Sequence, residues 1–538
     1  MSASSKKKLR SAEQAEKMTE KQLAEQKEAK KLKLYTTLAV VIMIALVVFA
    51  AYTGISKTIT NSGIRERSTV ALTIGENEIS NAELNYYFID AVNRFYNQYG
   101  NYAGLVGLDI TKPLNEQVSN GEQRMTWADD FLQGAIESIK ATYALVAEAK
   151  AKGVTLPEES TAAIDSALDT MEVYATAYGY PSVKAYLKAM YGNGATEKGL
   201  RNFYEMTELA RYYQSQYQES LTYTDDQLRA AEAENFNKFS SYNYNYYYLN
   251  IYNFIEDEKD ANSEYTAEQK TAAIAKAEEA AKSLVEGNTT VEEFDAAIAA
   301  LPVNADNVSA ASFTSENTAY GSIFSGYADW MTDPARKTGD MTYVASTSTD
   351  AEGNETINGY YVVMFGSCND NNFALANVRH ILVSLEGGSY DSTTGVTTYT
   401  DEEKAAAKTE AESILNEWKA GAATEETFAA LANERSDDGN GTTGGLFEDV
   451  YPDRMVDAFE DWCFDDRKVG DTGIVESEYG YHVMFYSGDS ETTYRDHLIE
   501  TELRENDYTA WYNALVEATT VEEHDFKYIS MDLVLYNA

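Results

Sequence analysis

The sequence predicts an α+β protein with a single transmembrane helix, a mostly helical region and two units that each consist of a small antiparallel sheet covered by helices. Three observations carry this prediction: one long apolar run near the N-terminus, helical spacing of apolar residues up to about residue 240, and an internal repeat in the second half of the chain. At 538 residues the chain is too long for a single core, and typical domain sizes predict about three or four units.

The N-terminus has the pattern of an uncleaved signal anchor. Residues 1–34 form a basic tail with ten Lys/Arg and five Glu, and residues 35–54 (YTTLAVVIMIALVVFAAYTG) carry no charge. A run of this length crosses a bilayer as a helix. The positive-inside rule then predicts a single-pass plasma-membrane protein with a cytoplasmic N-terminus and a large extracellular part. A cleaved signal peptide is the alternative, because FAAY offers small residues, but its charged n-region would be far too long.

The rest of the chain is strongly acidic. The net charge of −44 minus the +5 of the basic tail leaves −49 for residues 35–538. This charge argues against a nucleic-acid partner. It favours solubility of an exposed domain, with attraction of basic polypeptides or wall-bound cations as the alternative. The oligomeric state does not follow from the sequence.

Residues 68–240 are expected to form a helical domain. After a short alternating strand and a turn at Gly75, Ser80 and Glu83 have the spacing of a capping box, and the apolar residues that follow recur at helical intervals. Thr224 and Gln227 begin another capped segment. The C-terminal segment 489–538 has an amphipathic helix and a predicted strand at 524–536 (HDFKYISMDLVLY). It is too small to fold alone, so we expect it to pack on the helical domain.

The remaining chain is a diverged repeat of two units, 241–370 and 374–488. Four pairs of segments match in the same order: YTAEQKTAAIAKAEEAAKSL with YTDEEKAAAKTEAESIL, VEEFDAAIAAL with EETFAALANE, DWMTDPARKTGDM with DWCFDDRKVGDT, and NGYYVVMFGS with EYGYHVMFYSG. Each unit has the order strand, helices, turn, strand, and its strands are rich in β-branched and aromatic residues. The repeat therefore predicts two small antiparallel sheets covered by helices.

Neither a disulfide framework nor a cofactor motif is present in the sequence. The two cysteines, Cys368 and Cys463, are too few for such a framework, and a bridge between them is the less favoured interpretation. No clustered Cys/His set suggests zinc, and no Walker or dinucleotide glycine loop occurs. We therefore expect no metal and no cofactor.

The four histidines of the chain are distributed unevenly over the repeat. His380 and His482 lie on the first and last predicted strands of the 374–488 unit, and the sister unit has neither. A single histidine in an apolar strand is usually a core residue. Two in one unit, both absent from its repeat, indicate a candidate site.

Several motifs of this unit together resemble one family. VRHILVS, FAALANERSDD, RMVDAFEDWCF, VGDTGIV and YGYHVM, in this order and spacing, resemble the parvulin family of peptidyl-prolyl cis-trans isomerases. The wider plan of membrane anchor, helical region, parvulin unit and returning C-terminal helix resembles the PrsA and SurA type of extracytoplasmic foldase and covers roughly residues 68–538. The 68–240 region is then the chaperone-like domain of such proteins.

The resemblance implies roles for individual residues. His380 and His482 are the paired histidines of the parvulin site, and Asp438 falls where the family places a Cys or Asp that faces the substrate carbonyl. Met455 and Phe459 line the proline pocket, and their spacing of four predicts one helix face.

One loop departs from the family pattern. The family's GGDLGxF is GGLFEDV here, so that Leu446 matches only loosely as a substrate-binding residue and Asp449 occupies the usual aromatic position.

The resemblance implies a peptidyl-prolyl isomerase that chaperones exported, partly folded polypeptides containing X-Pro bonds. In the 241–370 unit, Tyr248 lies near the first histidine position and Tyr361 occupies the second. The unit also lacks the Met/Phe pair in register, so we expect a degenerate unit without catalysis. The alternatives are a non-catalytic holdase or binding protein in which both units are inactive and the helical region binds clients, and a surface assembly scaffold. The sequence does not predict the clients or the preferred residue before proline.

Overall fold

The computed structural model describes residues 63–120, 124–255, 265–307, 309–350, 353–392, 394–439 and 443–535, together with Met43. The predicted transmembrane segment 35–54 lies, apart from Met43, outside the described residues. Within the described ranges no helix has both the length and the apolar character needed to cross a membrane. Contacts divide the described chain into two compact units, one made of residues 223–503 and the other of residues up to 222 together with 504–535.

The second of these is a mostly helical unit. Its helices are α3 (Ile64–Ser68), α4 (Asn81–Tyr99), α5 (Trp127–Ala151), α6 (Glu158–Ala177), α7 (Val183–Tyr191), α8 (Glu197–Ser220) and the part of α16 (Tyr494–Glu517) from Arg504 onward. Its short 3₁₀ helices are η1 (Gly100–Val106) and η2 (Leu114–Glu116). Its strands are β1 (Val70–Ile74), β2 (Asn77–Ser80), β3 (Val118–Asn120), β4 (Met125–Thr126) and β15 (Val521–Glu523).

The cap of α4 differs from the predicted capping box. The Ser80 hydroxyl accepts the N–H of Glu83 at 3.2 Å, but the Glu83 carboxylate accepts the Tyr143 hydroxyl of α5 at 2.6 Å. The carboxylate thus bonds a neighbouring helix instead of returning to the cap. The box predicted at Thr224 and Gln227 is confirmed at the start of α9 (Asp225–Glu234).

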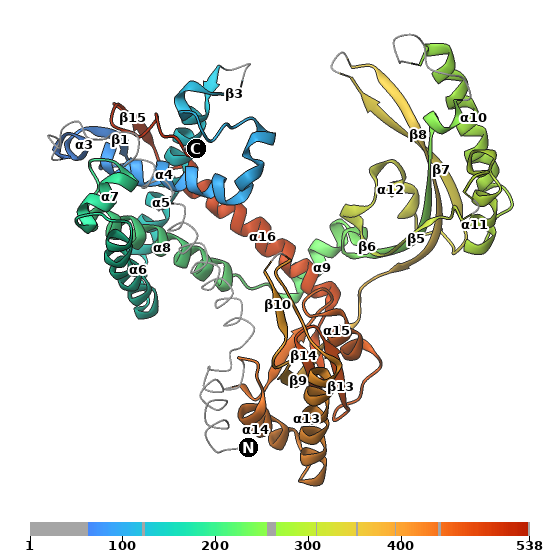
Figure 1. Ribbon diagram of the computed structural model, residues 1–538. Helices are drawn as coiled ribbons and strands as arrows, with labels where there is room; N and C mark the ends of the chain where they lie inside the picture. The colour runs from blue at the N-terminus through green and yellow to red at the C-terminus, as the bar shows by residue number, and fades with distance from the viewer. Residues whose placement is uncertain are drawn as a thin grey trace. The chain divides into compact units, whose positions relative to one another are not determined.

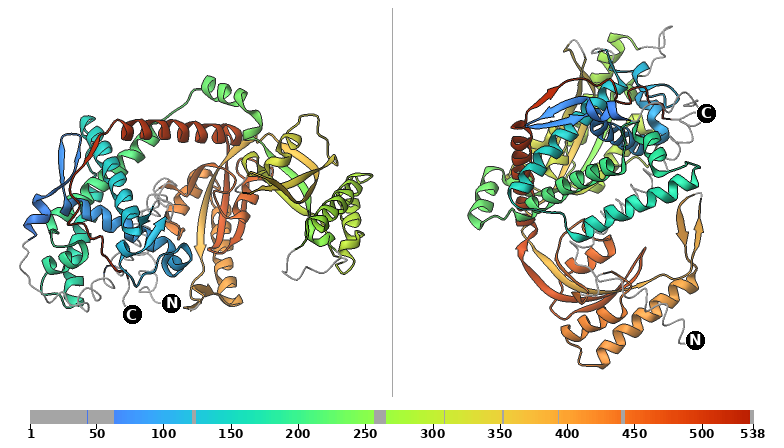
Figure 2. Two further views of the ribbon diagram at one scale, coloured as in Figure 1. Left: turned by 90° about the horizontal axis from the view of Figure 1, so that it is seen from above. Right: turned by 90° about the vertical axis from the view of Figure 1, so that its left-hand side faces the viewer.

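The predicted C-terminal strand at 524–536 is wrong. The strand is the shorter β15, which pairs with β1 at the edge of the sheet β15-β1-β2 (Figure 2). Beyond it the chain turns, and buried amides on α4 supply its hydrogen bonds: Asn81 donates to the carbonyl of Asp525 at 2.6 Å, and Asn85 accepts the N–H of Ser530 at 2.8 Å. These side chains replace a partner strand, which periodicity alone does not reveal.

The other unit contains both repeats. The first repeat is built from β5 (Ser241–Asn250), α10 (Ala267–Val285), α11 (Val291–Ala299), β6 (Phe313–Ala319), α12 (Ser325–Met331), β7 (Met341–Thr349) and β8 (Glu355–Asn369). The second is built from β9 (Ala374–Ser384), α13 (Asp401–Ala420), α14 (Glu425–Arg435), β12 (Leu446–Val450), α15 (Asp457–Phe464), β13 (Thr472–Ser477) and β14 (Gly480–Thr493), with a small hairpin of β10 (Ser389–Asp391) and β11 (Val396–Thr398).

The two sheets have the same strand order. The first is β6-β5-β8-β7 and the second is β12-β9-β14-β13, and every pairing is antiparallel. In the second sheet α13 and α14 pack on one face, and α15 lies with the opposite face (Figure 1). Alternate residues of the buried central strands therefore enter two different cores. Both cysteines are free, with Cys463 buried in α15 and Cys368 exposed on β8.

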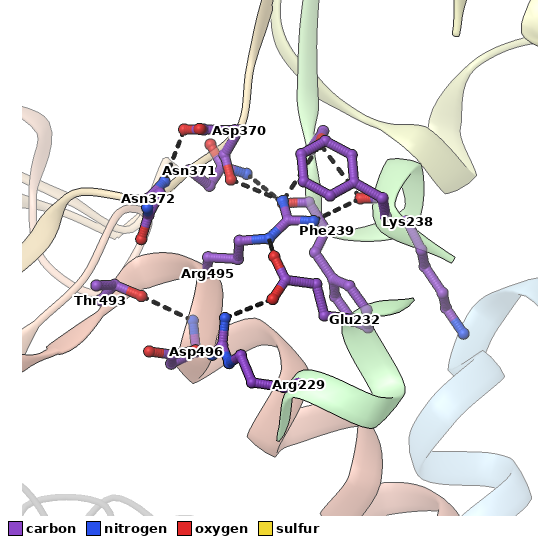
Figure 3. A network of polar contacts seen from close by, with 12 residues as sticks. Arg229, Glu232, Lys238, Phe239, Asp370, Asn371, Asn372, Thr493, Arg495 and Asp496 are labelled. Atoms are coloured by element: carbon purple, nitrogen blue, oxygen red, sulfur yellow. Dashed lines mark hydrogen bonds and ion pairs between the residues drawn. The ribbon is translucent and has the colours of Figure 1, made fainter. Parts of the chain in front are cut away.

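A buried arginine joins the segments that lead into the two repeats. Arg495 of α16 is 2% exposed and forms an ion pair with Glu232 of α9 (Figure 3). Its guanidinium also donates to the carbonyls of Phe236 at 2.8 Å and Asp370 at 2.7 Å, before β5 and between β8 and β9. A buried cation needs such a set of acceptors to offset its lost hydration. These contacts place α9 with the repeats, so that the division falls near residue 222 and not at the expected 240.

Candidate active site

The sheet register brings the two predicted histidines together. His380 on β9 pairs with Met484, and His482 on β14 pairs with Leu382. The two histidines are therefore diagonal neighbours on one face of the sheet. Their rings stack with centroids 5.3 Å apart, and their Nδ1 atoms are 3.1 Å apart. Both side chains are buried, at 2% and 6% exposure.

The loop after α14 brings Asp438 to the same place. Its carboxylate lies 2.8 Å from Nε2 of His380. The preceding residues hold the loop against β9, because the Ser436 hydroxyl accepts the N–H of Leu382 at 2.9 Å and the N–H of Asp437 donates to the Leu382 carbonyl at 2.8 Å. The three predicted polar residues therefore form one contiguous group.

Ser477 completes this group and was not predicted from the sequence. Its hydroxyl lies 2.7 Å from Nε2 of His482 and accepts the N–H of Tyr479 at 3.2 Å. One assignment satisfies the ring nitrogens of both histidines: Ser477 O–H donates to His482, His482 N–H donates to His380, and His380 N–H donates to Asp438. The sequence feature that could have indicated Ser477 is its position five residues before His482, at the turn between two strands.

Burial and neighbouring charges shift the pKa values of His482 and Asp438. Desolvation, with a further contribution from the charge of His380, lowers the pKa of His482 to about 3. Desolvation also opposes ionisation of Asp438, but the hydrogen bond and the charge of His380 outweigh it and hold the pKa of Asp438 below its usual value. At neutral pH the site thus has an uncharged His482 and an ionised carboxylate.

Aromatic rings enclose the histidine pair. Phe459 is 1% exposed, and its ring stands edge-on to both imidazoles, at 81° to His380 and 87° to His482. Phe447 lies 4.9 Å from His380 between ring centroids. Met455 packs at the edge of the same core, but it precedes α15, which begins at Asp457, so the expected shared helix face is wrong for this pair.

Leu446 is not brought to the histidines. It pairs with Arg379, whereas Phe447 pairs with Val378, and strand alternation places these two neighbours on opposite faces of the sheet. Phe447, and not the predicted Leu446, therefore lies against His380. Asp449 has a left-handed backbone, with φ of 52°, and its N–H donates to the Asn377 side chain at 3.0 Å, so polar contacts close the altered loop.

The register also corrects the comparison with the first repeat. Tyr361 pairs with Tyr248 as His482 pairs with Leu382, so the residue equivalent to His380 is Tyr246, not Tyr248. The first repeat lacks the Met/Phe pair in register, as expected. Aligning the DW dipeptides of the two repeats places Ile323 and Tyr327 at the positions of Met455 and Phe459.

One family model matches the part of the chain that contains this site. Residues 360–485 match the family model of the PPIC-type PPIASE domain. Among solved structures, the chain is similar to the peptidylprolyl isomerase PrsA of Bacillus anthracis, with 21% identity over 28% of this chain and 59% of that one and a TM-score of 0.18. It is also similar to the peptidyl-prolyl isomerase ESS1 of Candida albicans, with 27% identity over 21% and 63% of the two chains and a TM-score of 0.16.

A further similarity covers more of the chain. A structure of the SurA-like chaperones PEB4 and Cj1289 of Campylobacter jejuni matches 56% of this chain and 83% of that one at 11% identity, with a TM-score of 0.14. A search of curated proteins gave no match. Because these TM-scores are low, the family model carries the conclusion: the chain contains a parvulin-type peptidyl-prolyl isomerase domain, and the His380, His482 and Asp438 group lies within it.

Proposed function

We propose that the chain is a membrane-anchored extracytoplasmic foldase whose second repeat catalyses peptidyl-prolyl cis-trans isomerisation of exported polypeptides. The observation that carries this proposal is the hydrogen-bonded group of Ser477, His482, His380 and Asp438 inside a match to the PPIC-type domain.

The chemistry requires no covalent step. Rotation about an X-Pro bond is opposed by amide resonance, a barrier of about 18–20 kcal/mol. A site lowers this barrier by binding the twisted imide more tightly than either planar isomer. Asp438, held in its charged form, lies at the position of the family residue that faces the substrate carbonyl, and its contact with His380 fixes its orientation.

The apolar side chains supply the second part of this mechanism. Met455 is half buried at the margin of the core that contains Phe459, where it can cover a proline ring and exclude water. Dry surroundings favour the twisted state, because water stabilises the planar, more polar amide. The residues of this chain therefore bind, orient and desolvate the substrate, and no proton is transferred.

The full chain provides the direct test. It should accelerate cis-trans exchange of an X-Pro peptide, which is otherwise complete only in tens to hundreds of seconds. Exchange NMR measures the rate. Equal rates with and without the folded protein would reject catalysis.

The sequence supports the location. The uncharged run 35–54 follows a tail of net charge +5, which favours a single-pass anchor with residues from about 70 onward outside the cell. Protease added to intact cells should then degrade residues 70–538. Recovery of these residues uncut from protease-treated cells, after lysis, would overturn this location.

A holdase function is the second candidate, and the first repeat favours it. That repeat has tyrosines where the second has histidines, so it can bind polypeptide without isomerising it. The chain should suppress aggregation of an unfolded client even when Phe459→Ala has removed catalysis. A folded variant that gives no protection at several-fold excess would exclude this role.

A further inference from the structure

The first repeat presents a continuous aromatic surface at the place equivalent to the active site. Tyr246 and Tyr361, the counterparts of the two histidines, have ring centroids 6.2 Å apart. Tyr246 stacks on Phe313 at 5.5 Å, and Tyr361 contacts Phe324 at 4.9 Å. We call Phe313, Tyr246, Tyr361 and Phe324 the aromatic platform.

The platform is open to solvent, unlike the histidine pair. Phe313 is 60% exposed and Phe324 is 37% exposed, and both tyrosines are half buried. Tyr327 and Ile323 are buried in the core against which both platform tyrosines pack. Exposed rings on such a support are costly in water, and a contiguous set of them marks a binding surface.

The geometry points to a second, non-catalytic binding site on this platform that takes a proline-containing extended segment of an unfolded polypeptide. Proline has a flat, apolar ring and a preformed extended backbone, and aromatic-lined surfaces bind such segments at low entropic cost. The platform side chains carry no charge, so they suit a proline ring better than a charged side chain. The choice of proline rests on the proposed function, because the equivalent place in the second repeat is the isomerase site.

The platform lacks the groups that would catalyse rotation. Counting from the matched Phe294 and Phe428, Asn304 takes the place of Asp438. Its side chain donates to the Ile298 carbonyl at 2.8 Å and exchanges hydrogen bonds with Tyr247. Tyr247 and Tyr246 are strand neighbours and lie on opposite faces, so Asn304 does not reach the platform. The aromatic platform is therefore expected to bind a client polypeptide while the isomerase site of the second repeat isomerises its X-Pro bonds.

Two methyl groups allow the sites to be observed separately in the full chain. Ile323 lies under the platform, and Met455 lies at the isomerase site. We expect a labelled extended peptide with one central proline to shift the NMR signals of both methyl groups. The same peptide with alanine in place of proline should bind at least about tenfold more weakly at Ile323, because one ring contact carries much of the affinity.

Substitutions of exposed platform residues test the assignment without disturbing the core. Phe313→Ser with Phe324→Ser should abolish the peptide-induced shift at Ile323 and leave the shift at Met455 and the exchange rate unchanged. Tyr252→Ser is the matched control, because Tyr252 is 45% exposed in the same repeat and its ring contacts Tyr265, which is not a platform residue. It should change neither signal.

Three results would overturn the inference: an Ile323 shift that survives the double substitution, an equal response to the alanine peptide, or an Ile323 signal that never responds. The isomerase proposal is judged separately by the exchange rate of the same samples. Failure of catalysis with an intact platform response would leave the binding site in place.

Discussion

The two repeats share one fold and differ in the chemistry of one sheet face. Each has the same strand order and a short helix next to that face. In the second repeat the central strands place His380 and His482 in a buried polar group with Asp438. In the first, Tyr246 and Tyr361 belong to a partly exposed aromatic surface. The same fold thus places different side chains at equivalent positions. We propose that these side chains, together with Asp438 and the buried surroundings of the second site, separate catalysis from binding.

The largest effect is expected from truncating the buried aromatic ring of each site, Phe459 in the second repeat and Tyr327 in the first. Phe459→Ala should destabilise the second repeat by about 3–5 kcal/mol and reduce catalysed exchange almost to the uncatalysed rate, because both imidazoles lose their edge-on partner. Exchange NMR gives the rate, and denaturant unfolding gives the stability.

Tyr327→Ala is the matched control in the first repeat, where the ring is 4% exposed. It should cost comparable stability and leave the exchange rate intact. If both variants lost catalysis equally, the second repeat would not be the isolated seat of activity.

The two repeats should also differ in how their stability depends on pH. The pKa of His482 is depressed from 6.5 to about 3, so below pH 6.5 the unfolded chain binds a proton at this residue that the folded chain refuses. Stability of the second repeat therefore falls with decreasing pH between 6.5 and about 3, by up to about 1.4 kcal/mol per pH unit. Between pH 6.5 and 5 the loss should be about 1.6 kcal/mol, because the unfolded histidine is already half protonated at pH 6.5.

The described part of the first repeat contains no histidine, so its stability should stay nearly constant over this window. Hydrogen exchange at pH 6.5 and 5, corrected for intrinsic rates, resolves the two sheets. His482→Gln should flatten the response of the second sheet. A second sheet that is equally stable at both pH values would contradict a neutral, buried His482.

A smaller effect is expected from the charge of Asp438. Asp438→Asn keeps an acceptor for His380 but removes the charge, and hydrogen bonds to charged groups exceed neutral ones by about 1 kcal/mol. Catalysed exchange should fall about five- to tenfold. Asp437→Asn is the control, because the Asp437 carboxylate accepts the Ser384 N–H at 2.8 Å on the exposed side of the loop. Equal effects of the two substitutions would remove Asp438 from the site.

Much of the second repeat could be predicted because its signals are local. The paired histidines, Asp438 and the Phe459 ring stand in short motifs. Outside this repeat, the cap of α9 likewise follows from the four residues Thr224 to Gln227. The predictions that were wrong depended on strand register or on hydrogen-bond partners far away in the sequence. Tyr248 and Tyr246 differ by two positions and share a face, so that only the pairing of β5 with β8 tells which one matches His380.

The remaining errors have related causes. Leu446 and Phe447 are both apolar, and only their partners on β9 show which of them faces His380. The C-terminal strand was misplaced because Asn81 and Asn85, more than 400 residues earlier, satisfy its backbone. The spacing of hydrophobic residues indicates which side chains are buried, but it does not show which groups form hydrogen bonds with the backbone.

The last test attempts to convert the first repeat into the second, and we expect no gain of activity. In a chain that carries Phe459→Ala, Tyr246→His with Tyr361→His should place two imidazoles at the positions of His380 and His482. Without a carboxylate, one ring nitrogen of the new pair would have no charged partner, and the exposed platform would admit water.

The exchange rate of that triple variant should therefore remain at the value of Phe459→Ala alone, and methyl NMR of Ile323 should confirm that the first repeat is folded. Tyr361→His alone should give the same result, since Tyr246 remains. An acceleration in the triple variant would show that two histidines on this sheet suffice for catalysis. Asp438 and the dry surroundings of the second site would then be dispensable, and the difference between the repeats would reduce to two side chains.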